Sequence, residues 1–225
     1  AYGFIHGKWS LDNSRGDDFC GVNSEITVLR ETGCYADFTF PAWGRMRPAK
    51  CNSIYYATDD PDAPKSYDTG TDVAAGVPAS GDLMIFQGPG RVSGVPCTLA
   101  RIPGLVRLVD RLWGSCAVEA HIPPWPARVR RWAEADVHVQ GRSDWIFVKV
   151  HAHGALPANM KAYFSRNAAA LHGTLCSEYK EDRGWKLHYV TAREAYNLVK
   201  AAETGLEGEP RAYRDFDIPP YQNCF

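Results

Sequence analysis

The sequence has no apolar run near the roughly 20 residues that a membrane-spanning helix needs. No basic segment followed by an apolar core stands at its start, so no signal peptide is predicted. Net charge is also nearly absent, with 25 Lys and Arg against 26 Asp and Glu. Nucleic-acid binding needs a basic surface that neutralises phosphates. These absences predict a cytoplasmic protein without a membrane span and without a nucleic-acid partner.

Paired cysteines and glycine-rich phosphate loops are missing as well. None of the seven cysteines lies in a CxxC pair, which argues against a disulfide framework and against a structural zinc site. Free thiols fit a reducing compartment. No GxGxxG or GxxxxGK[ST] segment occurs, which argues against nucleotide binding.

Hydrophobic patterning predicts strands that alternate with helices. The expected strands cover residues 2–6, 35–40, 54–58, 83–87, 145–151 and 187–190, and the expected helices cover 24–30, 126–135, 160–179 and 191–203. This order is typical of the α/β class with a parallel sheet. We expect a (β/α) barrel-like fold, with an open doubly wound sheet as the alternative.

The expected domain organisation is a barrel portion over 1–205 and an irregular tail over 206–225. Residues 88–135 are expected to form an insertion or lid. The sequence opens on Ala1 within a strand-like run, so we expect the barrel to be incomplete at its N-terminus.

The segment 145–154 carries the strongest candidate site. Side chains alternate across a strand, so Lys149, His151 and His153 share a face with Trp145 and Phe147. The opposite face is aliphatic and is expected to pack against helices. Polar groups at the C-terminal end of a barrel strand are typical of an active site, and imidazoles two residues apart can reach one metal ion or substrate group. A hydrogen-bonded pair at a loop edge is the alternative.

His6 repeats this pattern at the end of the first strand, before Gly7. The following loop offers Trp9, which could stack on a pyranose ring, and Asp12 and Asn13, which could bond sugar hydroxyls. A solvated loop without function is the alternative.

Three carboxylates are weaker candidates for metal binding. Asp59 and Asp60 end the third strand, where they could serve as base and ligand or simply open a turn. Asp37 lies inside the second strand, where it could orient a histidine or meet an arginine. Trp43 could line a sugar groove, although a lone tryptophan more often packs in a core.

Four segments resemble the polysaccharide deacetylase family, which includes the nodulation-type chitooligosaccharide deacetylases. Residues 147–154 are similar to the family's late motif, an apolar strand that ends in a histidine. Residues 187–198 are similar to the closing strand and helix, and residues 25–44 to a mid-domain helix, strand and turn. Residues 5–14 are similar to large uncharacterised bacterial members.

The resemblance implies a divalent-metal hydrolase, with zinc as the expected ion, that removes acetyl groups from a polysaccharide or oligosaccharide. It implies His153 as the general acid, with His151 and His6 in the site. Asp12, Asn13, Trp9 and Trp43 would contact sugar, and Lys149 would stabilise negative charge. Asp59-Asp60 imitates the family's early Asp-Asp motif but comes after the mid-domain turn, in the wrong order, and no HxxxH pair is present. The family's own Asp-Asp motif and HxxxH pair are expected upstream of Ala1.

Two other functions remain open from the residues alone. In an amidohydrolase-like barrel, His151 and His153 would ligate the metal directly. A carbohydrate-binding domain without catalysis would also account for the aromatic content. The sequence does not indicate an oligomeric state.

Overall fold

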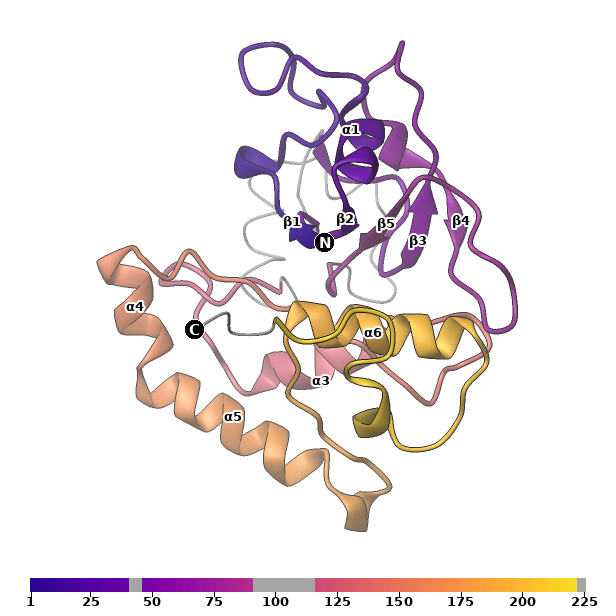
Figure 1. Ribbon diagram of the computed structural model, residues 1–225. Helices are drawn as coiled ribbons and strands as arrows, with labels where there is room; N and C mark the ends of the chain where they lie inside the picture. Colours follow the sequence, from indigo (N-terminus) through magenta and orange to yellow (C-terminus); the bar gives the residue numbers. More distant parts are fainter. Residues whose placement is uncertain (41–45, 91–115, 222–225) are drawn as a thin grey trace.

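The computed structural model describes residues 1–40, 46–90 and 116–221. Its centre is one mixed sheet of five strands in the order β1-β2-β5-β3-β4 (Figure 1). β1 pairs with β2, and β2 with β5, in parallel; β3 is antiparallel to both β5 and β4. The strands are β1 (Tyr2–Phe4), β2 (Cys34–Asp37), β3 (Ile54–Ala57), β4 (Thr71–Asp72) and β5 (Leu83–Phe86).

Five α-helices occur in the described residues. They are α1 (Glu25–Glu31), α3 (Ala127–Glu134), α4 (Pro157–Tyr163), α5 (Arg166–Glu178) and α6 (Ala192–Glu203). Short 3₁₀ helices lie at Gly7–Trp9, Ser66–Asp68, Glu181–Arg183 and Pro210–Tyr213. None of the described helices is long and apolar enough to cross a bilayer.

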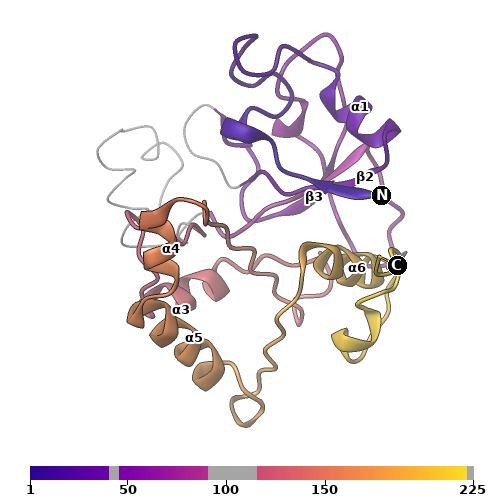
Figure 2. The ribbon, with the colours of Figure 1, turned by 60° about the vertical axis from the view of Figure 1, so that its left-hand side comes forward.

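One helix covers each face of the sheet (Figures 1 and 2). α1 buries Ile26 and Leu29 in a cluster with one set of strand side chains. α6 buries Leu198 and Val199 against the other set, together with residues of 137–147. Strand side chains point alternately to the two faces, and each face therefore acquires its own apolar cluster.

A smaller third cluster lies beside the sheet and joins α3 to α5 (Figure 2). Val129 and Trp132 of α3 contact Leu171 of α5 and Val118. Both Val129 and Trp132 are buried.

The expected barrel is wrong, because the sheet is single, open and mixed in direction. Residues 145–151 form no strand, and in the described residues their only ladder contact is an isolated bridge between Ala117 and His151. Residues 187–190 also remain outside the sheet. Val148 and Val150 are exposed, so the expected packing of that aliphatic face against helices is wrong too. Alternation of apolar and polar residues predicts which side chains are buried. It does not predict which strand, if any, supplies the backbone hydrogen bonds.

Capping side chains determine where α6 begins and where α4 and α5 are separated. The helix expected over 191–203 begins with a capping box, in which Glu194 N donates to Thr191 Oγ1 at 3.2 Å and Thr191 N donates to Glu194 Oε2 at 2.7 Å. The helix expected over 160–179 is instead two helices. Ser165 interrupts it, because its hydroxyl accepts from Ala168 N and donates to Ala162 O.

The C-terminal tail packs on α6 through one buried amide. Asn197 Nδ2 donates to the carbonyls of Arg214 and Ile218 at 2.6 and 2.8 Å, and its Oδ1 accepts from Ile218 N. The tail is therefore held in place although it is largely irregular. Most of the expected insertion, residues 91–115, lies outside the described residues.

Gly70 is required by the close approach of β4 to β3. It has φ +156°, and a Cβ there would lie 2.2 Å from the carbonyl oxygen of Tyr56. Gly70→Ala should lower the free energy of unfolding by at least about 3 kcal/mol in urea titrations, since overpacking and strain combine. Gly76→Ala is the control, because Gly76 has φ +72° and open space around its Cβ position. It should cost only about 1–2 kcal/mol; equal losses for the two variants would contradict this explanation.

Candidate functional site

The carboxyl ends of β1 and β2 place several polar groups at one edge of the sheet, where α/β proteins commonly bind ligands. His6 follows β1 and donates its backbone N–H to Thr39 Oγ1 at 2.8 Å. Thr39 follows β2, and its hydroxyl donates to Asp37 Oδ2 at 2.7 Å. The buried Asp37 carboxylate therefore holds the backbone of His6 through Thr39, and the prediction that Asp37 meets an arginine is not what the described contacts show.

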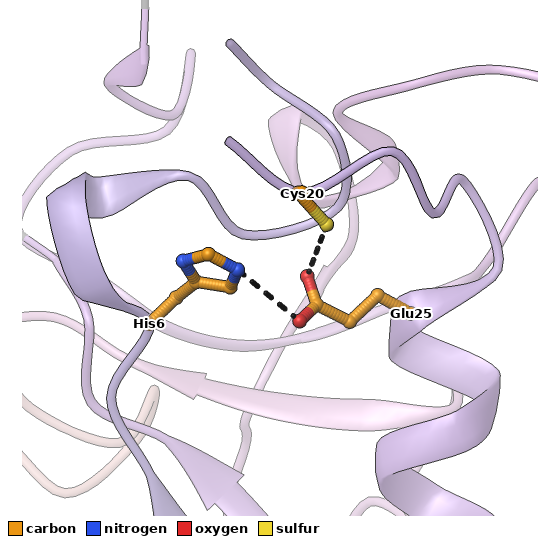
Figure 3. A group of neighbouring side chains, drawn as sticks. All are labelled: His6, Cys20 and Glu25. Atoms are coloured by element: carbon orange, nitrogen blue, oxygen red, sulfur yellow. Dashed lines mark hydrogen bonds and ion pairs between the residues drawn. The ribbon is translucent and has the colours of Figure 1, made fainter. Parts of the chain in front are cut away.

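His6, Cys20 and Glu25 form one cluster, which we call the N-terminal cluster (Figure 3). His6 Nε2 lies 3.4 Å from Glu25 Oε1, and Cys20 Sγ lies 3.4 Å from Glu25 Oε2. One nitrogen, one sulfur and one oxygen atom of the three residues lie within 4.8 Å of one another. Glu25 is the first residue of α1, so a strand end, a loop and a helix start meet here.

Asn13 holds the loop that carries Cys20. Its Oδ1 accepts from Gly21 N at 3.0 Å, and its Nδ2 donates to Asn23 Oδ1 at 2.9 Å. These bonds join the two ends of the loop that connects the 3₁₀ helix Gly7–Trp9 to α1. Asn13, which is expected to contact sugar, thus makes its described bonds within the loop.

Asp12 and Trp9 also contact other parts of the fold. Asp12 is fully buried, its N–H donates to Glu25 Oε2 at 2.6 Å, and its Oδ2 accepts from Ser66 N at 2.6 Å. Burial raises the pKa of Asp12 to about 6, against the lowering effect of the Ser66 bond. Trp9 is partly buried against the apolar cluster of α1. Neither side chain is presented as a sugar-binding surface.

Lys149 connects the second half of the chain to the sheet edge. Its Nζ donates to the carbonyl of Phe38 at 2.5 Å and also to the carbonyl of Phe40. Burial lowers the pKa of Lys149 to about 8, while the charges of Cys116 and Asp37 act in the opposite direction. The ammonium is thus occupied by backbone carbonyls, and its predicted task of stabilising charge on a substrate finds no support in these contacts.

His151 and His153 have different surroundings. His151 Nδ1 lies 3.1 Å from Cys116 Sγ, and burial, followed by the charge of Lys149, lowers the pKa of His151 to about 4. The imidazole of His151 is therefore neutral at pH 7. The His153 ring lies at 87° to that of His151, with 6.3 Å between their centroids.

His153 pairs with Glu119, a residue that the sequence did not identify. Its Nδ1 contacts Glu119 Oε1, and its side chain is 61% exposed while that of Glu119 is 6% exposed. His121 Nδ1 lies 3.3 Å from the other oxygen, Glu119 Oε2. Burial would raise the pKa of Glu119, but the hydrogen bond and charge of His153, with the charge of His121, lower it below its usual value. A buried carboxylate that orients a solvent-facing imidazole is typical of acid–base sites.

Asn159 fixes the backbone of both partners in this dyad. Its Oδ1 accepts from Ala120 N at 3.0 Å, and its Nδ2 donates to the carbonyl of His153 at 3.2 Å. Asn159 is itself buried at the start of α4. The dyad of His153 and Glu119 is therefore positioned by a helix rather than by the sheet.

The acidic candidates for metal binding lie elsewhere. Asp59 Oδ2 accepts from Thr27 N at 2.9 Å, which ties it to α1. Asp60 Oδ1 accepts from Asp62 N, the turn-opening bond that was the alternative interpretation. Within residues 1–40, 46–90 and 116–221, the N-terminal cluster is the one group of three or more donors that could hold an ion. Trp43 lies outside the described residues.

Asp12 should make stability depend on pH. Its native pKa, about 6, lies above the ordinary 3.8, so the native state holds more protons than the unfolded state between these values. Wild-type stability from this group is present below pH 4 and declines as pH rises to 6. Asp12→Asn should therefore gain stability relative to wild type over that range, by on the order of 2–3 kcal/mol. Denaturant titrations at pH 4, 5, 6 and 7 measure it, with exposed Asp18→Asn as control. A difference that does not change with pH would refute the assignment.

Several functional candidates of this site could not be read from the sequence. Glu25 and Glu119 are 19 and 34 residues from the histidines they contact, and no local pattern reports such a distance. Comparisons of the chain with protein-family models, with curated proteins and with solved structures found no match. The chemistry of the two groups of side chains therefore carries the functional argument.

Proposed function

We propose that this protein is a hydrolase that removes acyl groups, N- or O-acetyl, from a polysaccharide or oligosaccharide, with His153 as its proton donor. The supporting observation is the dyad of His153 and buried Glu119. The similarity of residues 147–154 to the late motif of polysaccharide deacetylases points to the same histidine.

The dyad suits protonation of a leaving group. With Nδ1 held by the carboxylate, the remaining ring nitrogen, Nε2, is free to act toward solvent. As water adds to the acyl carbonyl and the bond to the sugar nitrogen or oxygen breaks, the leaving atom needs a proton. His153 in its protonated form supplies that proton from Nε2, and Glu119 stabilises the imidazolium and fixes its orientation. The proton that the attacking water loses as acetate forms returns to Nε2 and restores the imidazolium.

The resemblance also implies a divalent metal, which would supply a Lewis acid for the acyl carbonyl. Asp59 and Asp60 do not fit this task, because each is bonded within its own turn or to α1. The N-terminal cluster fits better, since it combines the nitrogen, sulfur and oxygen donors that zinc accepts.

Direct ligation by His151 and His153 together is not favoured. Nδ1 of His151 faces Cys116, whereas Nδ1 of His153 faces Glu119. The two rings stand nearly perpendicular. The amidohydrolase alternative therefore lacks a specific observation in its support.

His153→Asn should reduce kcat for acetate release from acetylated chitooligosaccharides or acetylated xylan by at least about 100-fold, the range of acid–base catalysis. KM should change little, because the proton is transferred only as the bond breaks. Glu119→Gln should reduce kcat less, since the imidazole remains. The readout is enzymatic quantification of acetate over both substrates.

The matched control is His172→Asn, an exposed histidine on α5 whose ring contacts Tyr189. It should retain wild-type kcat. Full activity of His153→Asn would contradict the proposal. Glycan binding without acetate release by the wild-type protein would contradict it as well, and would identify a carbohydrate-binding module.

A further inference from the structure

We propose that His6, Cys20 and Glu25 form a zinc site with three protein ligands. The inference rests on the geometry of the N-terminal cluster and holds whether or not the protein is a hydrolase. The cluster lies in the first 25 residues of the chain and contains neither His151 nor His153.

The separations of the donor atoms match a tetrahedral ion. Zinc lies about 2.3 Å from sulfur and about 2.0–2.1 Å from nitrogen or oxygen, so its ligand atoms are about 3.3–3.6 Å apart. In the cluster, His6 Nε2 lies 3.4 Å from Glu25 Oε1 and Cys20 Sγ lies 3.4 Å from Glu25 Oε2, and one donor atom of each residue lies within 4.8 Å of the other two. The nitrogen–oxygen distance is long for a strong hydrogen bond, and both distances suit donors that gather around one ion.

The tautomer of His6 also favours an ion. Nδ1 lies 2.6 Å from the carbonyl oxygen of Gly7, and a carbonyl can only accept, so Nδ1 carries the proton. In the neutral ring the lone pair is then on Nε2, which points at Glu25 Oε1 (Figure 3). In that neutral form Nε2 and Glu25 Oε1 are both acceptors, and a cation between them satisfies both. A backbone carbonyl that orients the other nitrogen is the usual outer partner of a zinc-bound histidine.

The remaining ligands are oriented in the same way. Asp12 N donates to Glu25 Oε2 at 2.6 Å, and Cys20 N donates to the carbonyl of Gly16 at 3.3 Å. Asn13 ties the loop closed next to Cys20. His6 and Glu25 have side chains only 14% and 15% exposed. The ligands are therefore held by the fold before any ion binds, which reduces the cost of ordering them.

Three protein ligands leave the fourth tetrahedral position to water or a substrate atom, the arrangement of catalytic rather than structural zinc sites. The mixed donor set selects against magnesium and calcium, which prefer oxygen ligands alone.

The test is metal binding by the whole protein. After chelator treatment and desalting, the wild type should take up one equivalent of Zn²⁺ by isothermal titration and retain it in elemental analysis. Co²⁺ in place of Zn²⁺ should give a thiolate-to-cobalt charge-transfer absorption band. Cys20→Ser should abolish that band, and His6→Asn and Glu25→Gln should each weaken binding by at least about 100-fold. Asn13→Ala should weaken it about 10-fold, the effect of an outer-shell change.

Matched controls are Cys176→Ser, an exposed thiol on α5, and Glu31→Gln, an exposed carboxylate at the other end of α1. Both should bind zinc as the wild type does. Far-ultraviolet circular dichroism checks that each variant is folded. A Co²⁺ complex without the charge-transfer band, or equal zinc affinity in wild type and Cys20→Ser, would overturn the proposal.

The zinc-binding and acetate-release experiments test the zinc site and the hydrolase activity independently. Stoichiometric zinc with no acetate release leaves the zinc site standing and removes the hydrolase. Acetate release that depends on His153 in a protein without zinc affinity at this cluster does the reverse.

Discussion

Two buried charges at the carboxyl end of β2 join the halves of this molecule. The carboxylate of Asp37 and the ammonium of Lys149 come from residues 112 positions apart, and each affects the pKa of the other. Lys149 donates to the carbonyls on either side of Thr39, while Thr39 donates to Asp37 and accepts from His6. The position of His6 and the course of the segment that leads to His153 thus depend on the same few atoms.

Burial opposes both charges, since it raises the pKa of Asp37 to about 6 and lowers that of Lys149 to about 8. Each charge favours the ionised form of the other, and each group has its own hydrogen-bond partners. Removing one charge of such a buried network leaves the other to bear more of its desolvation penalty. The arrangement fixes geometry at a site more than it adds stability.

Local sequence signals predicted the elements and missed the way they combine. The helices expected over 191–203 and 24–30 and the strand expected over 83–87 lie close to the observed bounds of α6, α1 and β5. The barrel prediction is wrong because the alternation at 145–151 marks buried and exposed side chains in a segment that, within the described part of the chain, has no strand partner beyond one bridge. Pairing is a long-range property, and no residue in that segment encodes it alone.

The same limit applies to the candidate site. His6 and His153 were predicted because a histidine at the end of an apolar run is locally conspicuous. Their partners Glu25 and Glu119 were not, although Glu25 opens a helix that the sequence placed correctly. Asp12 and Asn13 were assigned to sugar binding from composition, and the folded loop uses both internally. Residue type indicated which side chains could take part in catalysis or binding. Only the fold determines which of them are left accessible to a substrate or an ion.

The coupling between Asp37 and Lys149 tests the account most directly. A double-mutant cycle with Asp37→Asn, Lys149→Met and the double variant, measured by urea unfolding at pH 7, isolates their interaction free energy. We expect a favourable coupling of about 1–3 kcal/mol, as for contacts within one buried network. Additive effects of the two substitutions, with a coupling near zero, would show that the halves of the chain are held together in some other way.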